Sequence, residues 1–390
     1  ETMSLTMQRG MRMRMNLPRV VLIGILLLVT NVLNFQLPRA DPSRPTMARA
    51  RDEGVGEVGE AQNLETIPDK RIPESPEDVA SVNTFKGCLD TIDVSRPDWI
   101  ALENVEAIDR EGPDDSSESN LKLCVDELES RGYTVECMLL DSEWYGLPQG
   151  RRRVYIVGIN LKSSEISLSG NKFFQNIQTI LRAMYIKAPP VDSLLLKEDD
   201  EAVVAYYEHL AELASNKTDD AQGAWTSLHM GVAEKRGIQW PLQVPKVISA
   251  SKWFDKMTPR TQEVIAFAAD EKYRLKKAIK FADVYHSANR YSTGGQSLPV
   301  VLPRSITWSF QRQRPLLGRE LLRCQGLCYH ATVLEPFTES QLGQLAGNAF
   351  AGNVILAVDM GVLASIRYTT PSEKSENEDI ADMVAGLGRI

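Results

Sequence analysis

The sequence predicts an α/β fold, and three observations support this prediction. The chain has 390 residues and is 43% hydrophobic, which is enough to bury one large domain and a smaller one. From residue 84 onward, helical and strand-like runs alternate, as they do where helices cover a sheet. The short apolar run at 99–102 is typical of a central parallel strand.

Composition excludes some classes of protein. The net charge of −8 and the pI near 5.3 argue against a surface that is basic throughout, although a local basic patch can still bind phosphate. The five cysteines are odd in number and scattered, which fits a reducing compartment. We expect no metal site, because there is no H-E-x-x-H or C-x-x-C motif, and Cys324, Cys328 and His330 are expected to fill a core edge.

The N-terminal part is expected to lie outside the folded domain. Residues 1–37 indicate a targeting or membrane-anchor segment, because four arginines precede an apolar run at 20–33. That run is short for a membrane span of roughly 20 residues, and a buried core helix is the alternative. Residues 38–82 are rich in Pro, Gly, Arg and Glu and are expected to be a disordered linker. The sequence does not decide whether 20–33 contacts a membrane, or in which compartment the protein resides.

The order of the remaining elements follows from periodicity and from turn residues. The expected elements before residue 160 are a helix at 84–92, a strand at 99–102 ending at Glu103, a helix at 120–131 closed by Gly132, and strands at 134–140 and 153–159. Those after it are a helix at 202–213, a basic helix at 272–280, strands at 300–302 and 307–310, and helices at 318–326 and 353–366. Ligands bind at the carboxyl ends of strands in α/β sheets, which makes Glu103 a candidate site residue.

Four motifs occur along this pattern in a fixed order. They are Glu103-Asn104-Val105, Gln149-x-Arg151-x-Arg153, Arg319-Glu320 with Gln325-Gly326, and Gly347-Asn348-Ala349. In this order they resemble the C5-cytosine DNA methyltransferase family, and the order is far more specific than any single motif. The resemblance implies a partial Rossmann-like S-adenosylmethionine-dependent methyltransferase sheet with a smaller target-recognition domain, DNA as partner and S-adenosylmethionine as cofactor.

The resemblance also implies roles for catalytic residues. In the family's reaction a thiolate adds to cytosine C6, and negative charge builds on the ring at N3 and O2. Glu103 would hydrogen-bond or protonate N3, Arg153 would hold O2, and Arg151 would organise the nucleophile loop or Glu103. Arg151 and Arg153 alternate along a strand, so both side chains can point into one pocket. Taken alone, Glu103 could equally be a solvated carboxylate, and the arginines a surface salt-bridge or phosphate patch.

Further residues are assigned to cofactor and nucleic acid. Asn348 and Ala349 would line part of the S-adenosylmethionine pocket, where Gly347-Asn348 permits a tight backbone approach at a helix entrance. An ordinary helix N-terminal turn is the alternative. Four arginines could contact DNA phosphates or could merely cover a helix with charge: Arg312, Arg314, Arg319 and Arg323.

The resemblance divides the chain into regions. We expect a partial catalytic domain at 83–165, a target-recognition-like region at 166–310, methyltransferase motifs returning to the catalytic domain at 311–368, and an acidic tail at 369–390.

The family's Phe-x-Gly-x-Gly and Pro-Cys-Gln motifs are missing from this sequence, and Cys88 falls on a predicted helix. Two classes of function therefore stay open. One is a truncated DNA cytosine-5 methyltransferase, and the other is a catalytically inactive methyltransferase-like module that binds nucleic acid or a partner and could be tethered to a membrane. The related tRNA methyltransferases are a third option.

Overall fold

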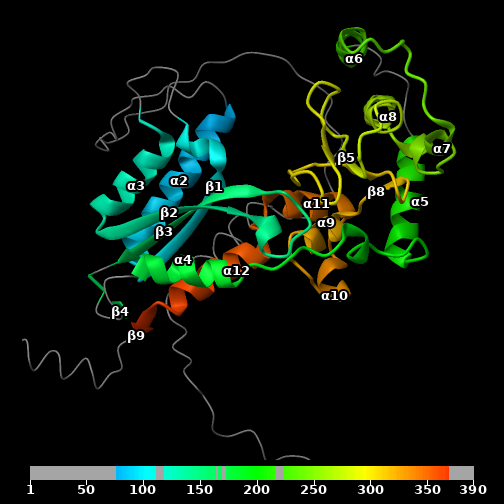
Figure 1. Ribbon diagram of the computed structural model, residues 1–390. Coiled ribbons are helices and arrows are strands. Elements are labelled where there is room, and N and C mark those ends of the chain that lie inside the picture. The colour runs from blue at the N-terminus through cyan, green and yellow to red at the C-terminus, as the bar shows by residue number, and fades with distance from the viewer. Residues whose placement is uncertain are drawn as a thin grey trace, which may run out of the picture. The chain divides into compact units, whose positions relative to one another are not determined.

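The computed structural model describes residues 76–110, 118–160, 162–163, 166–168, 173–215 and 224–368 (Figure 1). The predicted anchor at 1–37, the tail at 369–390 and most of the predicted linker lie outside these residues. The chain divides into a unit spanning Val29–Pro97 and a larger one comprising Glu1–Leu28 and Asp98–Ile390. The described part of the smaller unit contains helix α2 (Pro76–Ser95), so the end of the predicted linker is helical.

The first sheet of the larger unit has three described strands. They are β1 (Trp99–Val105), β2 (Tyr133–Asp141) and β3 (Arg152–Asn160), in the order β1-β3-β2. The predicted runs at 134–140 and 153–159 are confirmed as strands. The interpretation of 99–102 as a central parallel strand is wrong, because among the described strands β1 lies at an edge and pairs antiparallel with β3, with Glu103 opposite Tyr155. An apolar run of this length indicates burial but does not specify the partner strand.

Helices cover this sheet and complete its core. Helix α3 (Asn120–Ser130) packs against β2; the Ser119 hydroxyl caps its start, and Gly132 follows its end with φ of +88°, as predicted. Helices α4 (Phe173–Ala183) and α12 (Gly352–Leu363) lie side by side (Figure 1). Their buried residues, among them Ile177 and Val358, belong to the same apolar cluster as Val157 of β3. Although α4 follows the predicted boundary at 166, it shares the core of the first sheet.

A second antiparallel sheet forms a separate core within the larger unit. Its order is β6 (Ser292–Gly294), β5 (Phe281–Asp283), β7 (Thr307–Ser309) and β8 (Arg314–Pro315). The helices of this region are α5 (Glu201–Ser215), α6 (Ala224–Lys235), α7 (Lys246–Ser249) and α8 (Pro259–Tyr273). Trp308, Val264 and Phe254 are buried in its apolar cluster.

Two predictions for this region are wrong. The basic helix expected at 272–280 does not form, because α8 ends at Tyr273 and Lys276 takes a positive φ of 54°. Residues 300–302 are not a strand; instead, the amide of Leu298 donates to the carbonyl of Pro148 at 2.8 Å. A short apolar run can be buried in an irregular segment as well as in a strand. The apolar sequence alone does not distinguish the irregular segment from the strand.

The remaining elements include the predicted C-terminal helices. They are α9 (Gly318–Cys324), α10 (Ala331–Leu334), α11 (Glu339–Asn348), strands β4 (Ile166–Leu168) and β9 (Ile366–Tyr368), and short 3-10 turns at Glu106–Asp109, Ser142–Trp144, Val191–Ser193 and Phe254–Lys256. Helix α9 matches the helix expected at 318–326, and α12 matches the one expected at 353–366. Strand β4 pairs with β9.

One stretch of the described chain, Glu339–Leu363, is long and apolar enough by composition to cross a membrane. It consists of α11 and α12 with a break between them, and half of its most apolar window is buried inside the fold. Helix α12 contributes to the apolar cluster of the first sheet, and Leu342 and Ala346 of α11 belong to a further cluster with Leu321 of α9, so packing in the core accounts for their apolar character. The apolar run at 20–33, where membrane contact was predicted, is outside the described residues.

Candidate active site

The structure brings together the three residues assigned to catalysis. Glu103 lies near the end of β1, and Arg153 lies on the adjacent strand β3. Oε1 of Glu103 is 3.3 Å from Nε of Arg153 and 3.4 Å from Nη2 of Arg151. The exposed fractions of these side chains are only 14%, 11% and 5%, respectively. One carboxylate is thus held between two guanidinium groups in a largely desolvated environment.

The charge of this cluster is positive overall, with two guanidinium groups facing one carboxylate. Burial lowers the pKa of Arg153, the neighbouring Arg151 lowers it further, and Glu103 opposes both effects. The Nε atom of Arg151 is buried and has no hydrogen-bond partner among the described residues. A cluster with excess positive charge and spare donors is suited to hold a polar group that gains negative charge.

A buried glutamine joins the motifs that lie far apart in sequence. The side-chain amide of Gln149 donates to Oε1 of Gln325 at 3.0 Å, and its own Oε1 accepts from the Val301 amide at 2.9 Å. Gln325 in turn donates to the Ala346 carbonyl at 2.9 Å. The sequence prediction assigned no role to either glutamine, although both stand in the quoted motifs. The signal that could have pointed to Gln149 and Gln325 is a glutamine inside a motif of charged residues. A buried glutamine amide needs hydrogen-bond partners for both its NH₂ group and its oxygen, so it can connect two segments.

Arg151 connects the cluster to the last motif. Its Nη1 donates to the carbonyls of Val301 at 3.2 Å and of Gly347 at 3.5 Å. The expected close backbone approach is confirmed, because a Cβ added to Gly347 would lie 2.1 Å from the Pro303 nitrogen. The expected helix entrance is wrong: Gly347 and Asn348 end helix α11, and the next helix begins at Gly352.

The residues assigned to the cofactor do not by themselves form a pocket for S-adenosylmethionine. Asn348 is exposed, and Ala349 is buried with 8% exposure. Neither lines either of the two cavities that we describe. Asn348 is next in sequence to Gly347, whose carbonyl binds Arg151, so at most it offers one edge of a cofactor site beside the cluster.

The arginines assigned to DNA are not equivalent. The interpretation of Arg314 as a phosphate contact is wrong, because its side chain is fully buried and makes two hydrogen bonds with Glu320, at 2.8 and 2.9 Å. Arg319 pairs with Glu339 at 2.5 Å, and Arg323 donates to the Leu194 carbonyl at 3.5 Å, each from a partly exposed position. For Arg319 and Arg323 a phosphate contact stays a prediction.

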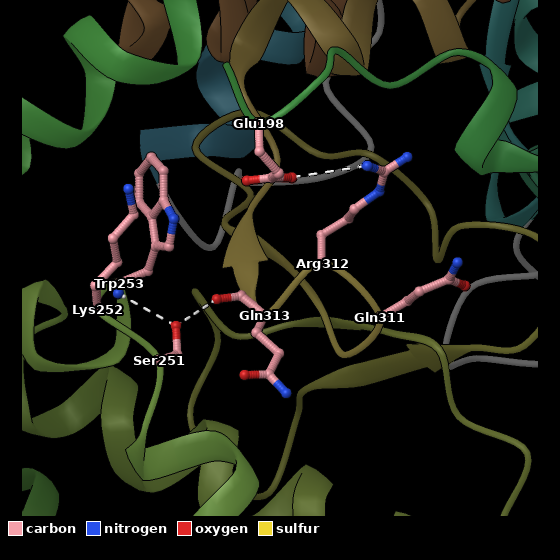
Figure 2. A pocket seen from close by; sticks show the side chains of 7 residues that line it. All are labelled: Glu198, Ser251, Lys252, Trp253, Gln311, Arg312 and Gln313. Atoms are coloured by element: carbon pink, nitrogen blue, oxygen red, sulfur yellow. Dashed lines mark hydrogen bonds and ion pairs between the residues drawn. The ribbon is translucent and has the colours of Figure 1, made fainter. Parts of the chain in front are cut away.

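Cavities and cysteines complete the description. A cavity of about 380 Å³ is lined by Glu198, Arg312 and Trp253 among others (Figure 2). No residue of the Glu103 cluster lines it.

Cys88 lies on α2, and partial burial raises its thiol pKa, which disfavours the thiolate. Cys324 is buried and Cys328 exposed. In the part of the chain that the structure describes, no group of three His, Cys, Asp or Glu residues could hold a metal ion.

The larger unit thus holds one carboxylate between two arginines, where β1 ends and β3 begins. The chain belongs to the C-5 cytosine-specific DNA methylase family, whose model matches residues 77–360. The fold prediction of an S-adenosylmethionine-dependent methyltransferase is thereby confirmed.

Curated relatives agree with this assignment. The chain is 25% identical over 311 residues to the DNA (cytosine-5-)-methyltransferase DMT5 of Verticillium dahliae, an alignment covering 75% of this chain and 13% of the relative. It is 26% identical over 300 residues to the DMT5 of Cryptococcus neoformans, covering 70% and 12%. The chain thus spans about an eighth of the length of these relatives. The structure of the S. pombe Dnmt2 methyltransferase has a TM-score of 0.34 and 15% identity, with 75% of each chain covered.

Proposed function

We propose that residues 98–368 form the base-binding part of a DNA cytosine-5 methyltransferase, with Glu103 and Arg153 holding the polar edge of an extruded cytosine. The observation that carries this proposal is the cluster in which Glu103 lies within 3.4 Å of both Arg151 and Arg153. The two DMT5 relatives are named as DNA methyltransferases, which favours DNA over tRNA as the substrate.

The chemistry of the cluster matches that base. Cytosine presents N3 and O2 side by side, so a carboxyl group and a guanidinium held close together can contact both at once. When a nucleophile adds to C6, negative charge develops on these two atoms. Arg153 stabilises this charge at O2, and Glu103, once its carboxyl group carries a proton, donates a hydrogen bond or that proton at N3. Arg151 positions Glu103 and is itself fixed by the carbonyls of Val301 and Gly347. When bound, S-adenosylmethionine would supply the methyl group.

Discrimination between bases tests this proposal. We expect the full chain to bind a duplex with one mismatched cytosine about tenfold more tightly than the same duplex with thymine there, since thymine carries a proton at N3 where Glu103 would donate. Glu103→Ala should remove the difference, whereas Arg153→Ala should weaken binding of both duplexes, because cytosine and thymine both carry O2. The measurement is fluorescence anisotropy with the two labelled duplexes. Equal affinity of the unaltered chain for both would overturn the proposal.

A second candidate is a module that binds nucleic acid without methyl transfer. The observation that favours it concerns the nucleophile, because none of the five cysteines in the sequence follows a proline. Cys88 lies within helix α2, and its raised pKa disfavours the thiolate that the reaction requires. Base binding by the Glu103 cluster is common to both candidates, so only the covalent step separates them.

We therefore expect the 390-residue chain to transfer no methyl groups. Incorporation of labelled methyl groups from S-adenosylmethionine into cytosine-containing DNA should equal that of a blank without protein. A tRNA substrate assayed in parallel tests whether the chain methylates tRNA instead of DNA. Turnover above the blank that disappears in Cys88→Ser would show that Cys88 is a nucleophile, contrary to this expectation.

A further inference from the structure

A second cavity, of about 620 Å³, is lined in part by residues next in sequence to those that hold the Glu103 cluster. Gly150, which lines it, stands between Gln149 and Arg151 in the chain. Leu298 also lines it, and its amide donates to the carbonyl of Pro148 at 2.8 Å. Val300 and Leu302 line it as well, and they flank Val301, whose carbonyl accepts from Arg151. The cavity therefore shares backbone segments with the residues that fix Arg151.

The polar groups that line this cavity are hydrogen-bond donors. They are the guanidinium of Arg290, the imidazole of His286 and the hydroxyls of Ser292 and Thr293, and no Asp or Glu is among the lining residues. Arg290, Ser292 and Thr293 are exposed, and none of the described contacts pairs their side chains. The carboxylate of Asp283 lies 3.7 Å from His286; it is almost fully buried and also accepts from the Ser305 hydroxyl. The cavity thus offers an unpaired cation and several donors.

The cavity of Figure 2 provides a contrast. There Arg312 faces Glu198 at 3.8 Å and Asp192 at 3.2 Å, so its charge is already compensated within the protein. Carboxylates beside a guanidinium cancel its attraction for an anion. A guanidinium without such neighbours attracts an anion. Of the two cavities, the one containing Arg290 is therefore suited to an anionic ligand.

We propose that the cavity of Arg290, His286, Ser292 and Thr293 binds a backbone phosphate of the nucleic acid strand whose base enters the Glu103 cluster. This assignment rests on the proposed function, because it places base and phosphate on adjoining sites of one strand. A phosphodiester is an anion with several acceptor oxygens, and Arg290 together with the two hydroxyls supplies the matching donors. Because the whole chain carries a net charge of −8, such local positive sites are needed to bind DNA.

The test is the salt dependence of DNA binding by the full chain. Removing one phosphate contact reduces the slope of log K against log[salt] by about 0.9 and weakens binding equally for all base sequences. Arg290→Ala should therefore lower the slope by about 0.9 and weaken binding of both the cytosine and the thymine duplex by about tenfold. Thr293→Asp should weaken both as well, because it places a negative charge at the phosphate.

Arg182→Ala is the matched control, since Arg182 is exposed on α4 and does not line the cavity; it should leave the slope unchanged. Thermal unfolding of each variant verifies that it is folded. A cytosine preference that persists with an unchanged slope in Arg290→Ala would overturn the phosphate site and leave the proposed function intact. A reduced slope without any cytosine preference would support the phosphate site and overturn the proposed function. A chain that binds neither duplex would overturn both.

Discussion

Arg314→Ala is expected to lower the free energy of unfolding by about 3–5 kcal/mol, because it leaves a buried carboxylate without its partner. Arg314 and Glu320 are both fully buried and make two hydrogen bonds with each other. Burial alone would lower the pKa of Arg314, but its hydrogen bonds to Glu320 and Glu198 raise it. Glu320 also accepts from the amides of Leu196 and Leu317, so the pair joins the segment at Leu196 to the segment from Arg314 to Glu320.

Urea unfolding followed by circular dichroism measures this effect. Arg312→Ala is the control, since Arg312 lies two residues away in a partly exposed ion pair with Asp192 and should change stability by less than about 1 kcal/mol. Arg314→Met combined with Glu320→Leu should recover much of the loss, because it removes both buried charges together. Equal stability of Arg314→Ala and Arg312→Ala would show that Arg314 is not the buried partner of Glu320.

The second large effect is expected at Gly347, where alanine should destabilise the fold by about 1–3 kcal/mol and disturb the active site. A Cβ at this position would lie 2.1 Å from the Pro303 nitrogen and 2.2 Å from the Leu302 carbonyl carbon. Both are backbone atoms, so relief requires movement of the segment or of α11. Because the Gly347 carbonyl accepts from Arg151, this movement should also shift Arg151 relative to Glu103. The cytosine preference should therefore fall together with stability.

Gly343→Ala offers a control in the same helix. The nearest atom to a Cβ at Gly343 is the Cα of Gly318, at 3.9 Å, which is an ordinary contact. Alanine is a better helix former than glycine by about 1 kcal/mol, so Gly343→Ala should leave stability unchanged or increase it. The two variants are compared by thermal unfolding and by the cytosine–thymine anisotropy measurement. A Gly347→Ala protein as stable and selective as Gly343→Ala would show that the contact with Pro303 does not constrain the site.

The difference between predicted and observed structure has physical causes at particular residues. The spacing of Arg151 and Arg153, two residues apart at the start of an apolar strand, was enough to predict that both reach one site, because side chains of extended backbone alternate with period two. The direction of β1 was not predictable in this way, since a run of four apolar residues fits a parallel or an antiparallel neighbour. Nor does the sequence show that α4 shares the apolar cluster of the first sheet, because an amphipathic helix buries an apolar face without encoding which sheet receives it.

Local pattern by itself determined the strands at 134–140 and 153–159, the turn at Gly132 and the motif order from Glu103 to Ala349, all of which depend on neighbours in sequence. Tertiary structure alone decided which arginines are available to a ligand. Arg290 and Arg314 are the same residue type, yet one lines a cavity and the other is buried against Glu320. The cost of burying a charge depends on the partners that distant segments bring to it, and those partners exist only in the folded chain.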